Sequence, residues 1–251
     1  MDPMPNMPSS RRMIAVFAAG ALLAGAPALL ADGFSERTER GLTLVVPEQA
    51  ASNGTVYYVQ PGRDAQATFT SDAPLEHIKG TSNRVIGYAV WSDERGEGGP
   101  KGLVAGEFVM AVESLDTGIP LRDEHLQGSN WLNAATYPDV TFRLVESRDV
   151  EVVRRTDEFT TYSMTLVGDM TIKGITSEVR TPARITVMPE SEATRTRAQG
   201  DLIAIRAGFN VSLSEHGVAN QTIGAKVAED VEIDIALFLA TVSPEASRRG
   251  R

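Results

Sequence analysis

The sequence predicts an all-β chain in which one antiparallel domain of seven or eight strands forms a barrel or a sandwich. Its main signal is alternation with a period of two: apolar residues alternate with polar ones along Tyr162–Ile172, Val179–Val187 and Val231–Leu239. This pattern is typical of antiparallel sheet with one buried and one solvated face. Turn-forming residues separate the strand-like runs, at Glu97–Pro100, Ser147–Asp149 and Lys173–Gly174. Repeats and heptads are absent, so we expect a single folded domain.

The first 31 residues are predicted to be a signal peptide. Arg11-Arg12 precedes an apolar stretch rich in Ala and Leu, and small residues at Ala26–Ala28 and Ala31 suit a cleavage site. A twin-arginine signal is the alternative for the export route. A retained membrane helix is less favoured, because glycines and a proline interrupt the stretch. We therefore expect a periplasmic or secreted protein with no stable membrane anchor once the leader is removed.

Three further segments follow the leader. Residues 32–54 are predicted to be a polar N-terminal extension or linker, in which Leu42–Val46 has a β-like composition and ends at Pro47. The alternative for that stretch is a first strand packed on the folded domain. The β-domain is expected over residues 55–241, and residues 242–251 are expected to be a polar tail.

Composition narrows the classes of function. The 251 residues suffice for a leader and one domain with a sizeable core. The chain has no cysteine, so an exported form must be held by its apolar core without disulfides. Its net charge of −9 at pH 7 repels nucleic acid and anionic bilayers. We expect no nucleic-acid partner, and any lipid must be bound by burial and local groups.

A short helix is expected between two strands in the middle of the chain. The strand-like run ends at Ser114, a turn follows at Asp116–Gly118, and Pro120 suits the first helical position because that position needs no N–H. Asp123 and Glu124 lie near the start of the helix, where the backbone dipole favours negative charge. After Trp131 the chain re-enters a strand at Tyr137–Phe142. Such a helical plug reads as an end-cap on a barrel.

This segment resembles the signature of the YceI-like family of bacterial lipid-binding barrels. The matching positions are Asp116-Thr117-Gly118, Arg122-Asp123-Glu124-His125-Leu126, Trp131-Leu132, Tyr137-Pro138 and Phe142. A second match is Gly168–Thr176, a looser third is Phe209–Gly217, and the resemblance runs from about Tyr57 to Ala240. It implies an eight-stranded, lipocalin-like β-barrel with a tunnel for an isoprenoid or fatty-acyl chain. The region Gln60–Phe69 lacks the histidine usual in the family, which bears on the identity of the ligand.

The residues alone leave open whether the interior is hollow or filled. The strands contain small residues that leave room beside bulkier ones, namely Gly87, Ala89, Ala105, Gly106, Gly168 and Ala183. Methionines suit a flexible guest because their side chains adapt, but an eight-stranded barrel can also be filled by its own side chains. If a ligand is bound, the candidates for its apolar lining are Phe108, Met110, Val112, Tyr162, Met164, Leu166, Met170 and Ile185.

Energetics favour a long-chain lipid or isoprenoid as the ligand. Each buried methylene contributes about 0.8 kcal/mol, whereas immobilising a partner costs on the order of 4–15 kcal/mol. Micromolar binding, about −8 kcal/mol, therefore needs a chain nearer to about twenty carbons than ten. The candidates for contact with a polar headgroup at the barrel mouth are Arg122, His125, Asn130 and Trp131, and for Trp131 the favoured role is to close the barrel end.

Catalysis, metals and cofactors are not expected. His77, His125 and His216 are not spaced as metal ligands. The chain has no nucleophile elbow, phosphate-binding loop, dinucleotide fingerprint or zincin motif. Two other classes stay open: a structural or adhesion-type β module with a filled core, and an envelope hydrolase. The sequence leaves open whether the protein is a homodimer.

Overall fold

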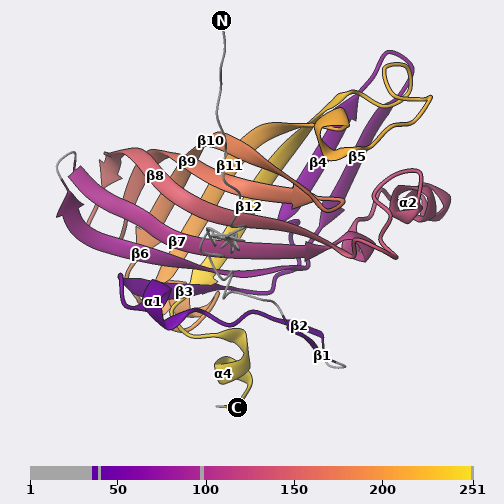
Figure 1. The fold of residues 1–251 in the computed structure, drawn as a ribbon. Helices are drawn as coiled ribbons and strands as arrows, with labels where there is room; N and C mark the ends of the chain where they lie inside the picture. Colours follow the sequence, from indigo (N-terminus) through magenta and orange to yellow (C-terminus); the bar gives the residue numbers. More distant parts are fainter. Residues whose placement is uncertain (1–35, 39–40, 97–98, 250–251) are drawn as a thin grey trace, which may run out of the picture. The chain divides into compact units, whose positions relative to one another are not determined.

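The computed structural model describes residues 36–38, 41–96 and 99–249 (Figure 1). The signal peptide predicted over residues 1–31 lies outside the described residues. The fold below is that of the unit running from Asp32 onward.

The unit is built around a closed antiparallel β-barrel of eight strands, as predicted (Figure 1). The hydrogen-bonded order around the ring is β3, β6, β7, β8, β9, β10, β11, β12 and back to β3. Every pairing between neighbours is antiparallel. The ring strands are β3 (Thr55–Val59), β6 (Val85–Gly96), β7 (Gly99–Ala111), β8 (Asp139–Arg155), β9 (Thr160–Ile172), β10 (Ile175–Met188), β11 (Leu202–Ser212) and β12 (Asp230–Ala240).

A hairpin of two further strands extends the wall at one end of the barrel. β4 (Ala67–Asp72) follows β3 along the same partner, β12, and β5 (His77–Ser82) pairs with β4 and leads into β6. The buried side chain of Gln66 holds the junction, because its Oε1 accepts a hydrogen bond from the Val85 N–H at 2.8 Å. On its other edge β5 makes one isolated bridge among the described residues, in which Thr81 and Asp116 exchange backbone hydrogen bonds of 2.8 and 2.9 Å. The sheet therefore has a free edge beside the segment that follows β7.

The two-residue β9–β10 turn forms as the sequence pattern predicts. Lys173 and Gly174 both adopt positive φ, 51° and 76°. Two successive residues with positive φ form a hairpin turn whose twist matches that of the paired strands. Glycine adopts positive φ without steric cost. The Lys173 ammonium donates to the Gly217 carbonyl at 2.9 Å, which fixes the turn to the β11–β12 connection.

Short elements occupy the connections and the flanking segments. Between β7 and β8 lie η1 (Val112–Ser114) and α2 (Pro120–Gln127), α3 (Glu192–Arg195) precedes β11, and η2 (Ser214–His216) follows it. The predicted linker contains a separate hairpin of β1 (Glu36–Thr38) and β2 (Gly41–Thr43), followed by α1 (Glu48–Ala51). β2 pairs with β1 and with no barrel strand in the described part of the chain, and the predicted polar tail contains α4 (Pro244–Arg249). None of the helices in the described residues has the length and apolar content needed to cross a bilayer.

One half of the barrel interior is filled by its own side chains. The Trp91 and Tyr162 rings pack against each other in a tilted arrangement with centroids 4.8 Å apart, and the Trp91 indole N–H donates to Asp93 at 2.7 Å. Inward residues of the other strands complete this packed half, among them Leu103, Met164, Leu166, Ile185, Ile203 and Leu239. All of these side chains are buried, so this half of the interior supplies the apolar core that stabilises the barrel.

Candidate functional site

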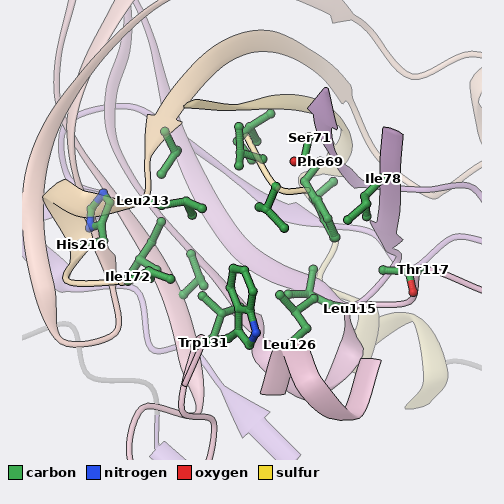
Figure 2. A pocket seen from close by; sticks show the side chains of 18 of the residues that line it. Phe69, Ser71, Ile78, Leu115, Thr117, Leu126, Trp131, Ile172, Leu213 and His216 are labelled. Carbon is green, nitrogen blue, oxygen red and sulfur yellow. The ribbon is translucent and has the colours of Figure 1, made fainter. Parts of the chain in front are cut away.

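The other half of the barrel encloses a cavity of about 820 Å³. It lies at the end where the β4–β5 turn, the β7–β8 connection, the β9–β10 turn and the β11–β12 connection meet. In Figure 2, Leu115, Leu126 and Trp131 face Phe69 and Ile78 across the space, with Ile172, Leu213 and His216 on a further side. Most of its lining side chains are apolar. A space of this size is within the range of small-molecule sites, about 300–1,000 Å³.

Phenylalanine rings lie against glycines of neighbouring strands along the cavity wall. A Cβ on Gly80 would meet the Phe69 ring at 2.2 Å, and a Cβ on Gly168 would meet the Phe142 ring at 2.3 Å. In the same way, a Cβ on Gly87 would lie 2.7 Å from the Phe108 ring. The strand glycines therefore do not leave empty space, as the sequence suggested for Gly87 and Gly168. They provide recesses in which aromatic rings lie close to the wall.

The segment between β7 and β8 closes one side of the cavity. Pro120 occupies the first turn of α2, as predicted, and the Asp123 carboxylate accepts hydrogen bonds from the Thr117 N–H at 2.8 Å and the Thr117 hydroxyl at 2.6 Å. Gly118, at φ 75°, makes the turn that this arrangement requires. Leu126 and Trp131 then project into the cavity from α2 and the loop after it (Figure 2). The segment is thus a wall built on local hydrogen bonds.

Charged side chains from three separate segments meet at the rim. The Glu76 carboxylate lies 3.8 Å from the Arg122 guanidinium and 3.8 Å from the Lys226 ammonium. Glu76 comes from the β4–β5 turn, Arg122 from α2 and Lys226 from the β11–β12 connection, and all three line the cavity. At 3.8 Å these ion pairs are longer than hydrogen bonds, so the N–H groups remain able to donate elsewhere. Two cations share the Glu76 carboxylate, and Glu124, which also lines the cavity, balances the remaining positive charge.

A buried histidine joins two of the connections at the mouth. His216 is 2% exposed, its Nδ1 lies 3.1 Å from the Ile175 carbonyl, and its Nε2 lies 3.1 Å from the Ser177 hydroxyl. A carbonyl can only accept, so Nδ1 carries the proton and Nε2 accepts from Ser177. This pair lacks an acidic partner and Ser177 does not line the cavity, so we assign His216 the structural role of tying η2 to the β9–β10 hairpin.

The structure separates the residues predicted to line a ligand site into two groups. Phe108, Met110 and Met170 line the cavity, as do the four mouth candidates Arg122, His125, Asn130 and Trp131. The other five do not line it: Tyr162, Met164, Leu166 and Ile185 belong to the packed half, and Val112 is buried at the start of η1. Period-two alternation identifies which side chains point inward, but it carries no information about their depth in the barrel.

Sequence reasoning missed several of the lining residues. The largest are Phe69, Ile78, Leu115, Leu126, Phe142, Leu213 and Ile233. Ile233 was visible in the alternation of Val231–Leu239, and Phe142 in the family resemblance. Phe69 and Ile78 gave no such signal, because their position depends on how β4 and β5 extend the wall.

Polar and metal-ligating groups in the described part of the chain also bear on the site. The described residues contain no group of three or more His, Asp or Glu side chains placed to hold a metal ion. Every buried side-chain nitrogen or oxygen in that part of the chain has a hydrogen-bond partner. The lining is mostly apolar, and its charged side chains lie on the connections and not on the strands, so the arrangement suits an apolar guest with a polar end.

Comparison with known proteins places this barrel among established relatives. The UPF0312 protein of Yersinia pestis is 31% identical over 78 residues, which are 31% of this chain and 35% of that protein. The chain thus spans about a third of the length of the curated relatives it matches, which include a UPF0312 protein of Yersinia pseudotuberculosis at the same identity.

Solved structures share the fold at low sequence identity. BcnA of Burkholderia cenocepacia gives a TM-score of 0.53 at 18% identity, covering 72% of this chain and 98% of BcnA. The YceI protein of Campylobacter jejuni gives 0.50 at 17% identity, covering 77% and 95% of the two chains. The family model described as a YceI-like domain matches residues 57–239. Since that match runs from β3 to β12 and takes in all eight strands of the ring, the chain belongs to the YceI-like family.

Proposed function

We propose that the protein binds the hydrocarbon tail of an amphiphile, a polyisoprenoid or a long acyl chain, in the cavity of the barrel. The observation that carries this proposal is the apolar cavity of about 820 Å³, which is walled by strand side chains on one side and by Leu126 and Trp131 on the other. Its lining offers dispersion contacts and few hydrogen-bonding groups, so the guest that it fits is a hydrocarbon.

Apolar burial supplies enough free energy for useful affinity. At about 0.8 kcal/mol for each buried methylene, a tail of about twenty carbons gains about 16 kcal/mol. Association costs on the order of 4–15 kcal/mol. A binding free energy near −8 kcal/mol, which corresponds to a micromolar Kd, lies within the resulting range.

The rim provides the polar end of the site. Arg122 and Lys226 hold unused N–H donors beside Glu76, and His125 and Asn130 line the same part of the cavity. A polar headgroup that emerges between β5 and α2 would meet these side chains. An oxygen-rich headgroup is favoured, because the Arg122 guanidinium and the Lys226 ammonium donate well to oxygen atoms.

Export and a binding role complete the proposal. Arg11-Arg12 and the apolar stretch after it support secretion or a periplasmic location, where the barrel would hold a lipid away from water. The tail would be bound unchanged, and the protein would act as a carrier or reservoir for it. The lack of an acidic partner for the Ser177–His216 pair supports binding over hydrolysis.

The test is ligand recovery followed by titration. Native mass spectrometry of protein purified from the host envelope should show a bound lipid, and the delipidated protein should take up a fluorescent long-chain fatty acid. Ile233→Trp fills the cavity and should abolish uptake, because Ile233 is part of the lining on β12. Val145→Trp is the matched control, since Val145 is 55% exposed on β8 and should leave uptake unchanged. Ligand-free protein that takes up no long-chain lipid would contradict the proposal.

A further inference from the structure

The cavity ends part of the way through the barrel, at a pair of phenylalanines. Phe108 on β7 and Phe142 on β8 both line the cavity and both pack against the buried core of the other half. Their ring centroids are 6.4 Å apart. The packed half beyond them contains the tilted ring pair Trp91 and Tyr162, 2% and 8% exposed. The phenylalanine pair therefore marks, on β7 and β8, the boundary between the hollow and the filled half, and we refer to it as the floor.

The floor is held in place by its neighbours. The Phe142 ring occupies the recess above Gly168, and the Phe108 ring lies against Gly87 and Gly106, where added Cβ atoms would come within 2.7 and 3.3 Å of it. A ring that left its recess would open a void at the strand backbone and lose the dispersion contacts that it makes there. The rings consequently keep their place on β7 and β8 and mark the bottom of the cavity there.

The space above the floor is short. On β12 the inward residues that line it run from Val231 to Ile235, while the next two inward residues, Leu237 and Leu239, are buried in the packed half. Four residue steps at about 3.4 Å give a strand-lined depth of about 14 Å. The whole cavity, including the part under α2, holds about 820 Å³. If one methylene takes about the volume of a water molecule in the liquid, about 30 Å³, this space accommodates about 27 carbons.

We propose that the Phe108–Phe142 floor sets the size of the ligand, so that the protein selects amphiphiles with a single tail of up to about 25 carbons. Longer polyisoprenoid chains and lipids with two long acyl chains exceed the space and must leave part of their hydrocarbon in water. This inference rests on the proposed function and narrows its class of ligand. Phe108 and Phe142 become residues that determine specificity.

The test measures Kd for the full chain, delipidated, against straight-chain fatty acids of about 12 to 30 carbons. Affinity should rise by up to about fourfold for each added methylene while the methylene is buried. The rise should stop near about 25 carbons. Affinity that keeps rising through the longest acids would overturn the floor while leaving lipid binding intact. Failure of every acid to bind would instead overturn the proposed function, and this inference with it.

Two variants locate the limit in the structure. Phe142→Ala removes one ring of the floor. It should shift the break, which is the chain length at which the affinity stops rising, to acids longer by several carbons. Phe238→Ala is the control: Phe238 alternates with the inward Leu237 and Leu239, and its ring is stacked under Arg197 at 3.6 Å, so the break should stay where it is. An unchanged break in a folded Phe142→Ala variant would overturn the assignment of the floor. The series on the unmodified protein decides the length limit even if that variant does not fold.

Discussion

The recess between β4 and β5 allows a substitution of one methyl group to test the cavity. In Gly80→Ala the new Cβ would lie 2.2, 2.4 and 3.1 Å from three atoms of the Phe69 ring, and its three nearest contacts are all with that ring. Backbone conformation is no obstacle, because Gly80 lies in extended strand and has no positive φ. The ring must therefore turn away from β5 and into the cavity that it lines.

The magnitudes can be worked out from these contacts. Overpacking costs about 1–3 kcal/mol, while replacing glycine by alanine in a compatible conformation returns about 0.4–1 kcal/mol through the unfolded state. The variant should thus lose up to about 2.6 kcal/mol of stability in the absence of ligand. If the displaced ring takes the place of about three methylenes of the ligand, binding weakens by about 2.4 kcal/mol, or close to 60-fold in Kd.

The assay combines urea unfolding with fatty-acid titration. Gly62→Ala is the matched control, because Gly62 lies in an exposed loop where the nearest heavy atom to a new Cβ is 3.9 Å away. Combining Gly80→Ala with Phe69→Leu should restore most of the lost affinity, since the smaller side chain relieves the clash. Parental stability and parental Kd in Gly80→Ala would refute the idea that glycine recesses hold the rings out of the cavity.

Three further predictions concern other parts of the molecule. Met164→Trp should lower the free energy of unfolding by about 1–3 kcal/mol yet leave the Kd of the folded protein unchanged, because Met164 is 4% exposed within the packed half; unfolding and titration measure the two effects. Asp123→Ala removes both hydrogen bonds to Thr117 and should reduce hydrogen-exchange protection in α2 but not in the barrel strands, at a cost of about 1–2 kcal/mol. Burial, with a smaller effect of Asp201, raises the pKa of Tyr57 to about 12 from 10.0, so folding stabilises the neutral phenol. Stability should be retained below pH 10 and fall as the pH rises from 10 to 12, by up to about 1.4 kcal/mol per pH unit, and Tyr57→Phe should remove this component of alkaline urea unfolding.

The ring of strands was predictable because alternation and turns carry most of the information needed. Along β9, Tyr162, Met164, Leu166 and Met170 are buried, while Ser163 and Thr165 are only partly buried, as the period of two requires. The turn at Lys173–Gly174 and the helix that begins at Pro120 were equally visible, since both depend on local backbone chemistry. These features are set by a few neighbouring residues.

The candidate site was less predictable because it depends on contacts between distant strands. Whether Met164 or Met170 lines the cavity is decided by how far along the barrel each lies, and both have the same inward pattern. The glycines misled for a similar reason: a glycine in a strand indicates close approach, but not which side chain approaches. The Phe142 ring on β8 lies against Gly168 on β9, although the residue directly opposite Gly168 is Leu144. This diagonal contact depends on the register between the two strands, which the sequence pattern does not show.

The division of the barrel into two halves explains how one small domain can be both stable and hollow. An empty apolar space forfeits dispersion contacts for every side chain that faces it, so a barrel hollow along its full length would have little core. Here Trp91, Tyr162, Ile185 and their neighbours fill one half. The strands that carry them continue into the other half and stay hydrogen-bonded there to the neighbouring strands of the barrel. The cavity is then walled by strands that are already fixed at their far ends. A substitution in the filled half should therefore act on folding, and one in the hollow half on binding, which is the contrast that Met164→Trp and Ile233→Trp set up.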